Sequence, residues 1–449
     1  MHGYTESNEI ILLFDQYSLD SQRLHTSLKR AGYEHLAVAI EDDGFLPEGV
    51  MSIYGYFTED FKWKTGCNRK RSCSKIIIPE FSKLDEEYEG CQERGQVFYI
   101  WISKKRYVKS VKWYDKRDII RCVDHYNRYD AMYARTIFGV EGQRIKKLWF
   151  SPEGEKVMVE DMITGGITLN EGDSVKKFER KTDLIVYFFV KTGLWQSRIF
   201  YNSLSTPFFV SNRLGVVSKS DILFWQEPIG DEIPGNMQMI LDGRAGRTSE
   251  IVVQKKLAYE RLLELGADES LIHRLGYIYS FKKKNSHKAE ALICTNSENV
   301  EHCCEIVREI PQMHFHIVAV TAMSEKLLSV GEYENVSLYP GAGMDLIRNL
   351  FQNCDFYLDI NQEGEIVSAV YRAFLHNHLI FAFEETIHNR DYVTERWIYP
   401  AKDWKRMVED IRVIMEDAEL LERCLQRQRE EAMAENKQTY NEMLEPEIY

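Results

Sequence analysis

The order of the apolar runs constrains the fold of this chain more than any other feature of its sequence. Near both ends, strand-sized apolar runs alternate with helix-sized amphipathic stretches, as where Ile10–Phe14 is followed by Asp20–Arg30 and then Leu36–Ile40. This alternation is typical of a parallel sheet covered by helices. From about residue 50 to 190 the pattern changes to aromatic and β-branched runs separated by short turns, which predicts an antiparallel meander.

Local signals refine both patterns. In the first helix, Asp20 is predicted as the N-cap and Gly32 as the residue that ends the helix. In the middle region, the turn Ser151–Gly154 predicts a hairpin, and Leu184–Val190 is predicted as a further strand. The parallel pattern resumes near residue 196, with predicted strands over Asp221–Trp225 and Ile251–Gln254 and a predicted helix over Lys256–Leu265.

The part from about residue 289 repeats the alternation of strands and helices. Helices are predicted over Asn299–Ile310 and Glu365–Leu375, and the charged tail from Trp404 is also predicted to be helical. The strands are predicted over Ala291–Thr295, Phe315–Val320, Val336–Tyr339, Phe356–Ile360 and Leu379–Phe383.

These patterns divide the chain into four parts. They are a first Rossmann-like domain (residues 1–49 and 191–288), an inserted β-meander (50–190), a second Rossmann-like domain (289–403) and a C-terminal helical segment (404–449). We therefore expect an α/β fold with the glycosyltransferase-B architecture. In that architecture the carboxyl ends of the parallel strands line a cleft where ligands bind.

Charge and hydropathy argue against several classes of function. The formal net charge is −13, which disfavours a general nucleic-acid binder, although residues 61–120 hold 15 Lys or Arg against 8 Asp or Glu. The apolar runs are too short to cross a membrane as helices, and the polar segment Met1–Asn8 lacks the features of a signal peptide. We expect a cytoplasmic protein whose 9 cysteines are reduced thiols.

Four sequence blocks are longer than generic motifs: Asp42–Pro47, Ser197–Leu204, Asp221–Pro228 and Ile233–Gln238. In these blocks the chain resembles the stabilising subunits of the O-GlcNAc transferase of the accessory Sec system, which glycosylates serine-rich repeat adhesins before export. The resemblance covers most of the chain. It implies a paralogous catalytic subunit that transfers GlcNAc from UDP-GlcNAc to Ser or Thr. It also implies that this chain holds the acceptor polypeptide and raises its partner's activity.

Residues with which related retaining enzymes act on a nucleotide sugar are missing from the expected positions. The loop Asp15–Ser18 after the first strand contains no glycine, so it lacks the steric freedom that lets substrate approach the backbone. Two glutamates eight positions apart are common before a late helix, but Tyr371 follows Glu363 at that spacing and Ala373 follows Glu365. We interpret both glutamates as first-turn residues that favour the helix dipole.

Gln254 and Lys255 follow the last strand of the first domain, where related active enzymes tend to carry His. Gln cannot exchange a proton near neutral pH, and Lys255 is interpreted as a solvated residue at a helix start. We therefore predict a non-catalytic subunit with no catalytic residue, no metal ligand and no cofactor of its own.

The acceptor polypeptide is expected at strand ends of the first domain, in the cleft between the domains. The candidate contacts are Trp225, Gln226, Glu227 and Asn236. Side-chain amides can pair with an extended backbone, and Trp supplies apolar contact with a polar N–H group. Such contacts tolerate a repetitive, low-complexity sequence. The alternative is that Trp225 lies in the core and Gln226 satisfies its own loop.

Three other groups have both a functional and a structural interpretation. Lys282–Lys284 could hold a diphosphate, but a charge run in a linker is usually solvated. Cys67 and Cys73 bracket a basic stretch, which is typical of an exposed loop rather than a zinc site. His314 and His316 should point to one face of a strand and could form half of a metal site, with no third ligand evident nearby.

Aromatic and basic residues are interleaved near residue 105. This pattern could hold a single-stranded nucleic acid, and it also fits a sheet face that covers a partner protein, the interpretation that the acidic chain favours. Two other functions stay open: an active retaining glycosyltransferase, and a binder of nucleic acid or anionic membrane through the basic region. A peripheral contact with the inner face of the cell membrane is also left open. The interleaved aromatic and basic residues near residue 105 are Tyr99, Trp101, Lys104, Lys105, Arg106, Tyr107, Lys109, Lys112, Trp113 and Tyr114.

Overall fold

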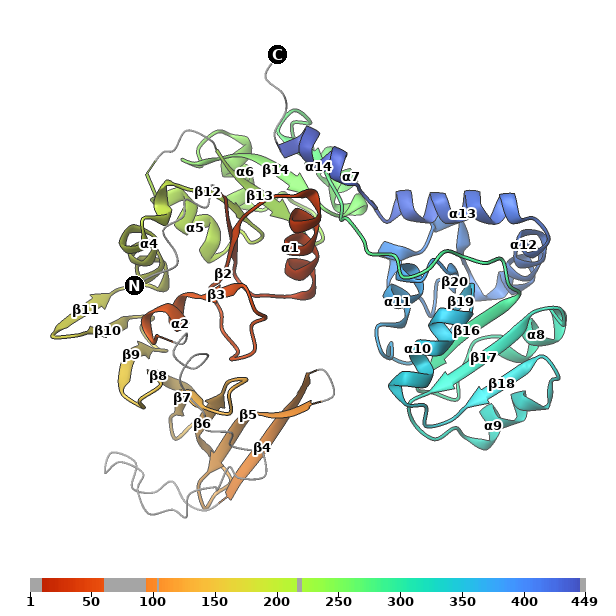
Figure 1. The fold of residues 1–449 in the computed structure, drawn as a ribbon, viewed down its shortest axis with the longest axis horizontal. Coiled ribbons are helices and arrows are strands. Elements are labelled where there is room, and N and C mark those ends of the chain that lie inside the picture. The colour runs from red at the N-terminus through yellow and green to blue at the C-terminus, as the bar shows by residue number, and fades with distance from the viewer. Residues whose placement is uncertain (1–9, 60–93, 103–104, 216–219, 445–449) are drawn as a thin grey trace. The chain divides into compact units, whose positions relative to one another are not determined.

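The computed structural model describes residues 10–59, 94–102, 105–215 and 220–444 of the chain. The chain divides into two compact units: unit 1 is Met1–Val252 with Leu265–His273, and unit 2 is Val253–Glu264 with Arg274–Tyr449. Each unit contains a parallel sheet, and unit 1 also contains the antiparallel meander (Figure 1). The expected α/β fold, with an antiparallel sheet inserted in the first of two Rossmann-like folds, is confirmed.

The parallel sheet of unit 1 has the strand order β15-β14-β13-β12-β1-β2-β3. β1 pairs in parallel with β12 on one side and with β2 on the other, and all its residues are buried. This is typical of a strand whose two faces are covered by helices. The strands are β1 (Ile10–Phe14), β2 (Leu36–Ala39), β3 (Val50–Ser52), β12 (Arg198–Tyr201), β13 (Asp221–Trp225), β14 (Thr248–Val253) and β15 (Ile272–Arg274). The described α-helices of unit 1 are α1 (Leu19–Ala31), α2 (Ile53–Phe57), α4 (Lys181–Thr192), α5 (Thr206–Arg213) and α6 (Gly235–Leu241). The next helix, α7 (Lys256–Glu264), belongs to unit 2.

The first helix is capped by a different residue from the one predicted. Ser18 is the N-cap of α1, and its Oγ accepts a hydrogen bond from Ser21 N at 3.2 Å. Asp20 lies inside the first turn, where it pairs with Arg23 at 2.7 Å and interacts favourably with the helix dipole. The predicted end is confirmed, since Gly32 has a left-handed φ of 98°.

The meander is an eight-stranded antiparallel sheet with the order β11-β10-β9-β8-β7-β6-β5-β4. The predicted hairpin at Ser151–Gly154 is confirmed, because β8 and β9 pair antiparallel and Gly154 N donates to Ser151 O at 2.9 Å. This order leaves β4 at one edge and β11 at the other. The strands are β4 (Arg94–Ile102), β5 (Lys105–Tyr114), β6 (Ile120–Tyr126), β7 (Met132–Phe138), β8 (Arg144–Phe150), β9 (Lys156–Asp161), β10 (Ile167–Glu171) and β11 (Ser174–Phe178).

Two segments at the ends of the predicted insertion differ from the prediction. Leu184–Val190 is not a strand but part of α4. Its continuous apolar run fits either element, and the buried residues Leu184, Ile185, Phe188 and Phe189 fall at helical spacing. At the other end, β3 pairs in parallel with β2, so residues 50–52 belong to the parallel sheet rather than to the meander.

The parallel sheet of unit 2 has the order β18-β17-β16-β19-β20-β21, and the five predicted strands are confirmed. α11 begins later than predicted, because Val367 and Ser368 adopt positive φ of 50° and 51° and the chain turns there before entering the helix. The strands are β16 (Glu290–Thr295), β17 (His314–Ala319), β18 (Val336–Tyr339), β19 (Phe356–Asp359), β20 (Leu379–Phe383) and β21 (Ile398–Tyr399). The α-helices are α8 (Cys303–Glu309), α9 (Glu325–Leu328), α10 (Met344–Asn353), α11 (Ala369–Leu375), α12 (Trp404–Glu416), α13 (Ala418–Glu431) and α14 (Lys437–Leu444).

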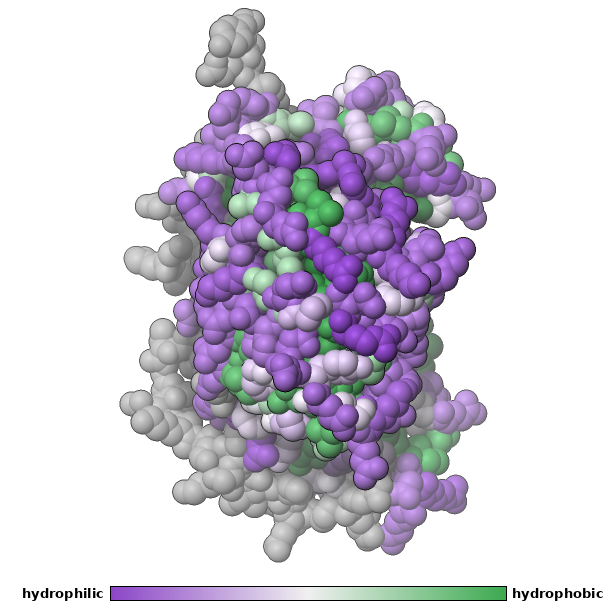
Figure 2. Space-filling view, turned by 90° about the vertical axis from the view of Figure 1, so that its right-hand side faces the viewer, coloured by the Kyte–Doolittle hydropathy of each residue, from purple (hydrophilic) through white to green (hydrophobic). Residues whose placement is uncertain are grey.

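The face in Figure 2 is mostly hydrophilic, with hydrophobic side chains scattered among polar ones. Within the described part of the chain, no helix combines the length and the apolar character needed to cross a membrane.

Candidate functional site

The loops that follow β12 and β13 meet the start of α1 at the carboxyl edge of the unit 1 sheet. Asn202 follows β12, and its Nδ2 donates to Ser21 Oγ at 2.9 Å and to Gln226 Oε1 at 2.8 Å. Gln226 follows β13, and its Nε2 donates to the carbonyl of Asp20 at 3.0 Å. These side-chain bonds tie both loops to the helix and therefore hold the edge in one arrangement.

The four candidate acceptor contacts occupy different environments at this edge. Trp225 and Gln226 are each 5% exposed, whereas Glu227 is exposed directly beside them. Asn236, in α6, is half-buried and donates from Nδ2 to Leu204 O at 2.9 Å. The first three residues thus form one segment at the end of β13, and Asn236 is tied to the loop after β12.

A charged group at the same strand ends was missed in the sequence. Lys181, at the start of α4, pairs with Glu41 at 2.5 Å and lies 3.7 Å from Glu160 of β9. Asp15 follows β1, and burial raises its pKa, with the charge of Glu41 adding to the rise. Asp15 and Glu41 lie one and two residues after buried strands, as the predicted contact Glu227 does, and this position was the signal that could have identified them. Together they make the edge acidic.

In unit 2, the loop that follows β19 is held by its own side chains. Asn361 is 1% exposed, and its Nδ2 donates to the carbonyl of Glu363 at 2.8 Å and to Asn296 Oδ1 at 3.1 Å. His388 Nδ1 lies 2.6 Å from Asp359 Oδ1, and His388 Nε2 lies 2.6 Å from the same Glu363 carbonyl. The bond to Asp359 raises the pKa of His388 to about 9. The protonated side chain of His388 therefore holds the loop after β19 in place near neutral pH.

Glu363 and Glu365 do not lie in the first turn of a helix, so that interpretation is wrong. Both are exposed and precede α11, and Glu365 Oε1 accepts a hydrogen bond from Val370 N at 2.8 Å. This bond satisfies a free donor at the helix start. Within α11, Ala373 is fully buried and Tyr371 packs at 5.2 Å from Tyr392. Neither residue can supply the second carboxylate.

Gln254 and Lys255 are both engaged within unit 2. Gln254 is 2% exposed, and its Nε2 donates to Gly276 O at 3.3 Å. Lys255 pairs with Asp391 at 3.2 Å, so its interpretation as a simply solvated residue is wrong. The pair fixes this Lys near η5 (Arg390–Tyr392).

The basic run in the linker is only partly solvated. Lys282 and Lys284 are exposed, as expected. The side chain of Lys283 is 7% exposed and pairs with the fully buried carboxylate of Asp355 at 2.5 Å, so the solvated interpretation fails for this residue. Alternation along an extended segment explains why one of three consecutive lysines turns inward.

The histidine pair is engaged in hydrogen bonds. His314 and His316 share one face, as predicted, with ring centroids 4.8 Å apart. His316 Nε2 contacts Glu290 Oε2 at 2.6 Å, and His314 Nε2 contacts Ser337 Oγ at 2.8 Å. Among the described residues, no three His, Cys, Asp or Glu side chains are grouped so that they could hold a metal ion. Cys67 and Cys73 lie outside the described residues.

The interleaved aromatic and basic residues lie on β4 and β5, at one edge of the meander. Trp101 is 67% exposed and Tyr99 is 43% exposed. The guanidinium of Arg106 lies 4.4 Å from the Tyr99 ring centre, and Lys105 Nζ lies 4.3 Å from that of Tyr107. Lys104 is outside the described residues. The edge strand therefore presents aromatic rings that are flanked by cations.

The chain contains two Rossmann-like folds, and the meander is inserted in the first. Its strand-end loops are closed by internal hydrogen bonds. These features define a glycosyltransferase-like protein. Four family models match consecutive segments: the GtfB N-terminal domain (residues 11–57), the GtfB middle domain (86–179), the GtfB third domain (181–265) and the GftB/GlyA-F C-terminal domain (291–428).

Curated relatives match almost end to end. The chain is 37% identical to the UDP-N-acetylglucosamine–peptide N-acetylglucosaminyltransferase stabilizing protein GtfB of Streptococcus pneumoniae, over 94% of this chain and 96% of that protein. It is 31% identical to the GtfB of Limosilactobacillus reuteri, over 96% of this chain and 97% of that protein. The chain belongs to this GtfB family of stabilising proteins.

Solved structures agree with the fold. A chain in the crystal structure of a GtfA/B complex bound to UDP and GlcNAc is similar at a TM-score of 0.85 and 34% identity, covering 97% of this chain and 99% of that chain. The pneumococcal O-GlcNAc transferase GtfA is similar at a TM-score of 0.54 and 11% identity, covering 97% of each chain. The second similarity concerns the fold alone. It shows that this chain shares its glycosyltransferase-B architecture with an enzyme.

Proposed function

We propose that the chain is a non-catalytic subunit that binds a serine-rich adhesin polypeptide and stabilises a paralogous catalytic subunit. That subunit transfers GlcNAc from UDP-GlcNAc to Ser or Thr, and the two form a hetero-oligomer in the cytoplasm. The observation that carries the non-catalytic role is the loop after β19. It is closed by Asn361 and His388, and no second carboxylate follows at the enzyme spacing. The stabilising role follows from the names of the GtfB relatives.

The lack of activity can be tested directly. The purified chain is incubated with labelled UDP-GlcNAc and a serine-rich peptide, with and without the catalytic subunit. We expect labelled peptide only when the catalytic subunit is present. Turnover by the chain alone would contradict the proposal and favour an active retaining enzyme.

The acceptor is proposed to bind at the carboxyl edge of the unit 1 sheet, where open α/β sheets bind ligands. Among the four candidate residues, Glu227 and Asn236 are accessible, while Trp225 and Gln226 form the support beneath them. Carboxylates accept hydrogen bonds from hydroxyl and backbone N–H groups, both abundant in a serine-rich chain. An unfolded acceptor loses chain entropy on binding, so we expect a modest affinity.

The acceptor contacts are tested by titrating a serine-rich peptide into Glu227→Ala, Asn236→Ala and the control Glu232→Ala. Glu232 is also exposed and lies in the same loop between β13 and α6, five residues after Glu227 and farther from the end of β13. Loss of one hydrogen bond to a carboxylate should weaken binding about tenfold for Glu227→Ala, or about 1.4 kcal/mol. Asn236→Ala should weaken it by less, since the side chain is already bonded to Leu204 O. Equal affinity of all three variants and the wild type would remove these residues as contacts.

The partner is proposed to bind the aromatic and basic face of β4 and β5. Exposed aromatic rings are the commonest anchors of protein interfaces, and Trp101 is the most exposed of those on this face. We expect Trp101→Ser to reduce co-purification of the catalytic subunit severalfold. Val175→Ser, at a 61% exposed position on the opposite edge strand β11, is the matched control. Retention of the partner by both variants would place its binding surface elsewhere.

A further inference from the structure

The side chain of Asn202 joins three strand-end loops of unit 1. Asn202 directly follows β12 and is half-buried, and it is not one of the four candidate acceptor contacts. Its Nδ2 donates to Ser21 Oγ at 2.9 Å and to Gln226 Oε1 at 2.8 Å. Its Oδ1 has no hydrogen-bond partner among the described residues. Asn202 therefore links the loops through its two N–H groups alone.

Two backbone carbonyls fix the direction of these hydrogen bonds. Gln226 Nε2 donates to Asp20 O at 3.0 Å, so the Gln226 side chain presents its oxygen to Asn202. Ser21 Oγ donates its single hydrogen to Gln16 O at 2.8 Å, so it can only accept from Asn202. Because a carbonyl oxygen cannot donate, both neighbours of Asn202 require a donor. A primary amide supplies two N–H groups on one nitrogen, whereas a carboxylate of the same shape supplies none.

The same bonds hold the accessible residues of the strand-end edge. Gln226 is 5% exposed, and the next residue, Glu227, is exposed, so fixing the Gln226 side chain fixes the point at which Glu227 leaves the sheet. The loop after β12 is held at its start by Asn202 and, two residues later, by the bond from Asn236 to Leu204 O at 2.9 Å. Both accessible acceptor candidates therefore contact or continue the loops that Asn202 joins.

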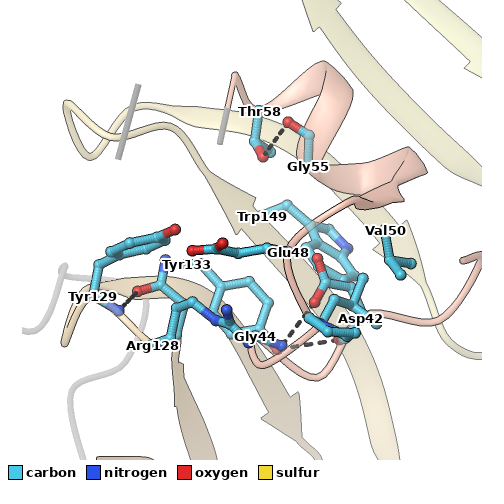
Figure 3. Close-up of a pocket in the computed structure, with 13 residues that line it drawn as sticks. Asp42, Gly44, Glu48, Val50, Gly55, Thr58, Arg128, Tyr129, Tyr133 and Trp149 are labelled. Carbon is cyan, nitrogen blue, oxygen red and sulfur yellow. Dashed lines mark hydrogen bonds between the residues drawn. The ribbon is translucent and has the colours of Figure 1, made fainter. Parts of the chain in front are cut away.

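The loop after β2 is held against the meander by other side chains. Arg128 Nη2 donates to Phe45 O at 2.9 Å, and the hydroxyl of Tyr133 donates to Asp42 O at 3.2 Å. Figure 3 shows Arg128 and Tyr133 on the meander side of this loop. Neither contact involves Asn202. A change at Asn202 should consequently leave the attachment of the meander, and with it the proposed partner face on β4 and β5, in place.

We propose that Asn202 is a positioning residue for acceptor binding, whose amide group holds Glu227 and the loop after β12 ready for an extended polypeptide. This inference rests on the acceptor site proposed above. An unfolded acceptor brings no rigid surface of its own, so affinity depends on an edge that is ordered before binding. Asn202 acts through its bonds to Gln226 and Ser21, and its own contact with the acceptor is not required.

The test is Asn202→Asp, which keeps the shape of the side chain but removes both N–H donors. The affinity of the full chain for a fluorescently labelled serine-rich peptide is measured by anisotropy. We expect binding to weaken about threefold to tenfold, because the loops are no longer ordered in advance. Co-purification of the catalytic subunit should be unchanged.

Asn285→Asp is the matched control. Asn285 is also half-buried, and its Nδ2 also donates two bonds, to Asp355 O at 2.9 Å and to Asn377 O at 2.7 Å. These residues belong to unit 2 and precede β19 and β20, so they lie at the amino ends of its strands. The control should lower thermal stability, as Asn202→Asp does, and leave the peptide affinity unchanged.

A double-variant cycle distinguishes positioning from a purely structural role. If Asn202 acts through Glu227, Asn202→Asp should weaken binding by less than about twofold in a Glu227→Ala background. A full, additive loss in that background would overturn the inference. So would unchanged peptide affinity of folded Asn202→Asp, or an equal loss of affinity in Asn285→Asp.

Two further outcomes are also decisive. Failure of the wild-type chain to bind the peptide would overturn the acceptor site and this inference together, whereas the outcomes above overturn the positioning role alone. Should Asn202→Asp fail to fold, Ser21→Ala takes its place, because it removes only one of the two bonds of Asn202. We then expect affinity to fall about twofold to threefold, and an unchanged affinity would overturn the positioning role.

Discussion

At the scale of single residues, the buried pair of Arg247 and Asp221 is a strong local constraint in unit 1. Both side chains are 0% exposed, and two guanidinium–carboxylate bonds of 2.9 and 3.0 Å join them. The remaining guanidinium hydrogens bond to the carbonyls of Trp195, Ser197 and Gly215. The pair thus connects the segments around β12, β13 and β14.

Arg247→Met should therefore lower the free energy of unfolding by about 3–5 kcal/mol, because it leaves a buried carboxylate unpaired. Arg244→Met is the matched control. Arg244 pairs with Asp242 at 2.5 Å but is 62% exposed, so we expect a change of about 0–1 kcal/mol. Chemical denaturation measures both values, and similar losses for the two variants would contradict the assignment.

His388 gives unit 2 a pH dependence. Its folded pKa of about 9 lies above the ordinary value of 6.5, so its pairing with Asp359 stabilises the fold fully below about pH 6.5. This stabilisation is lost as the pH rises through about 9. His388→Gln should accordingly cost more unfolding free energy at pH 6 than at pH 10, by about 1–2 kcal/mol after allowance for solvent screening. Denaturation at both pH values measures the difference, and an equal cost would disprove the role of the charge.

The burial and the contacts of single residues were harder to predict from the sequence than the helices and strands. The sequence placed Trp225, Gln226, Glu227 and Asn236 at strand ends, and the structure shows that the first two are buried. The bond from Asn202 to Gln226 could not be foreseen, because it joins loops 24 residues apart whose separation depends on strand order. Whether these residues contact an acceptor stays a prediction.

At the scale of elements, the loop after β2 determines how the meander is attached to the parallel sheet. Gly44→Ala should destabilise unit 1 by about 1–3 kcal/mol more than Gly49→Ala. Both residues have positive φ, +83° and +85°, so the backbone strain is the same. Only at Gly44 would the new methyl group meet other atoms, while nothing lies within 4 Å at Gly49. Equal thermal stability of the two variants would show that the loop is not tightly packed.

Element type followed from the sequence wherever periodicity was unambiguous. β18 and β20 match their predicted residues one for one. Leu184–Val190 was misassigned because an unbroken apolar run lacks the alternation that distinguishes a strand from a buried helix. Two signals would have identified this segment as a helix. They are the capping box of Arg180 and Asp183 at its start and Gly193, with a φ of 76°, at its end.

At the scale of the whole molecule, the C-terminal segment completes unit 2 rather than forming an independent tail. Tyr277 bridges to Ala434, and the hydroxyl of Tyr440 donates to Gly276 O at 2.7 Å. Gly276 packs so closely on Met433 that a Cβ would lie 1.8 Å from its carbonyl oxygen. The sequence predicted helices here, but it held no sign of their return to residues 276–277, since contacts so distant in sequence leave no periodic pattern.

A chain that ends at Glu431 should consequently lose amide-exchange protection throughout unit 2 and keep it in unit 1. Hydrogen exchange on the truncated and full chains measures this, with removal of residues 445–449 alone as the control. Protection lost equally in both units would mean that they unfold as one, and protection lost in neither would mean that the last helix is dispensable.

The return of residues 433–440 to Gly276 also sets an order of events during synthesis. A ribosome must translate more than 150 residues beyond Gly276 before that contact can form, and chains emerge at about 5–20 residues per second. Unit 1, which is nearly complete by His273, can fold well before then. A partner that recognises the meander could thus engage the nascent chain while its second half is still immature.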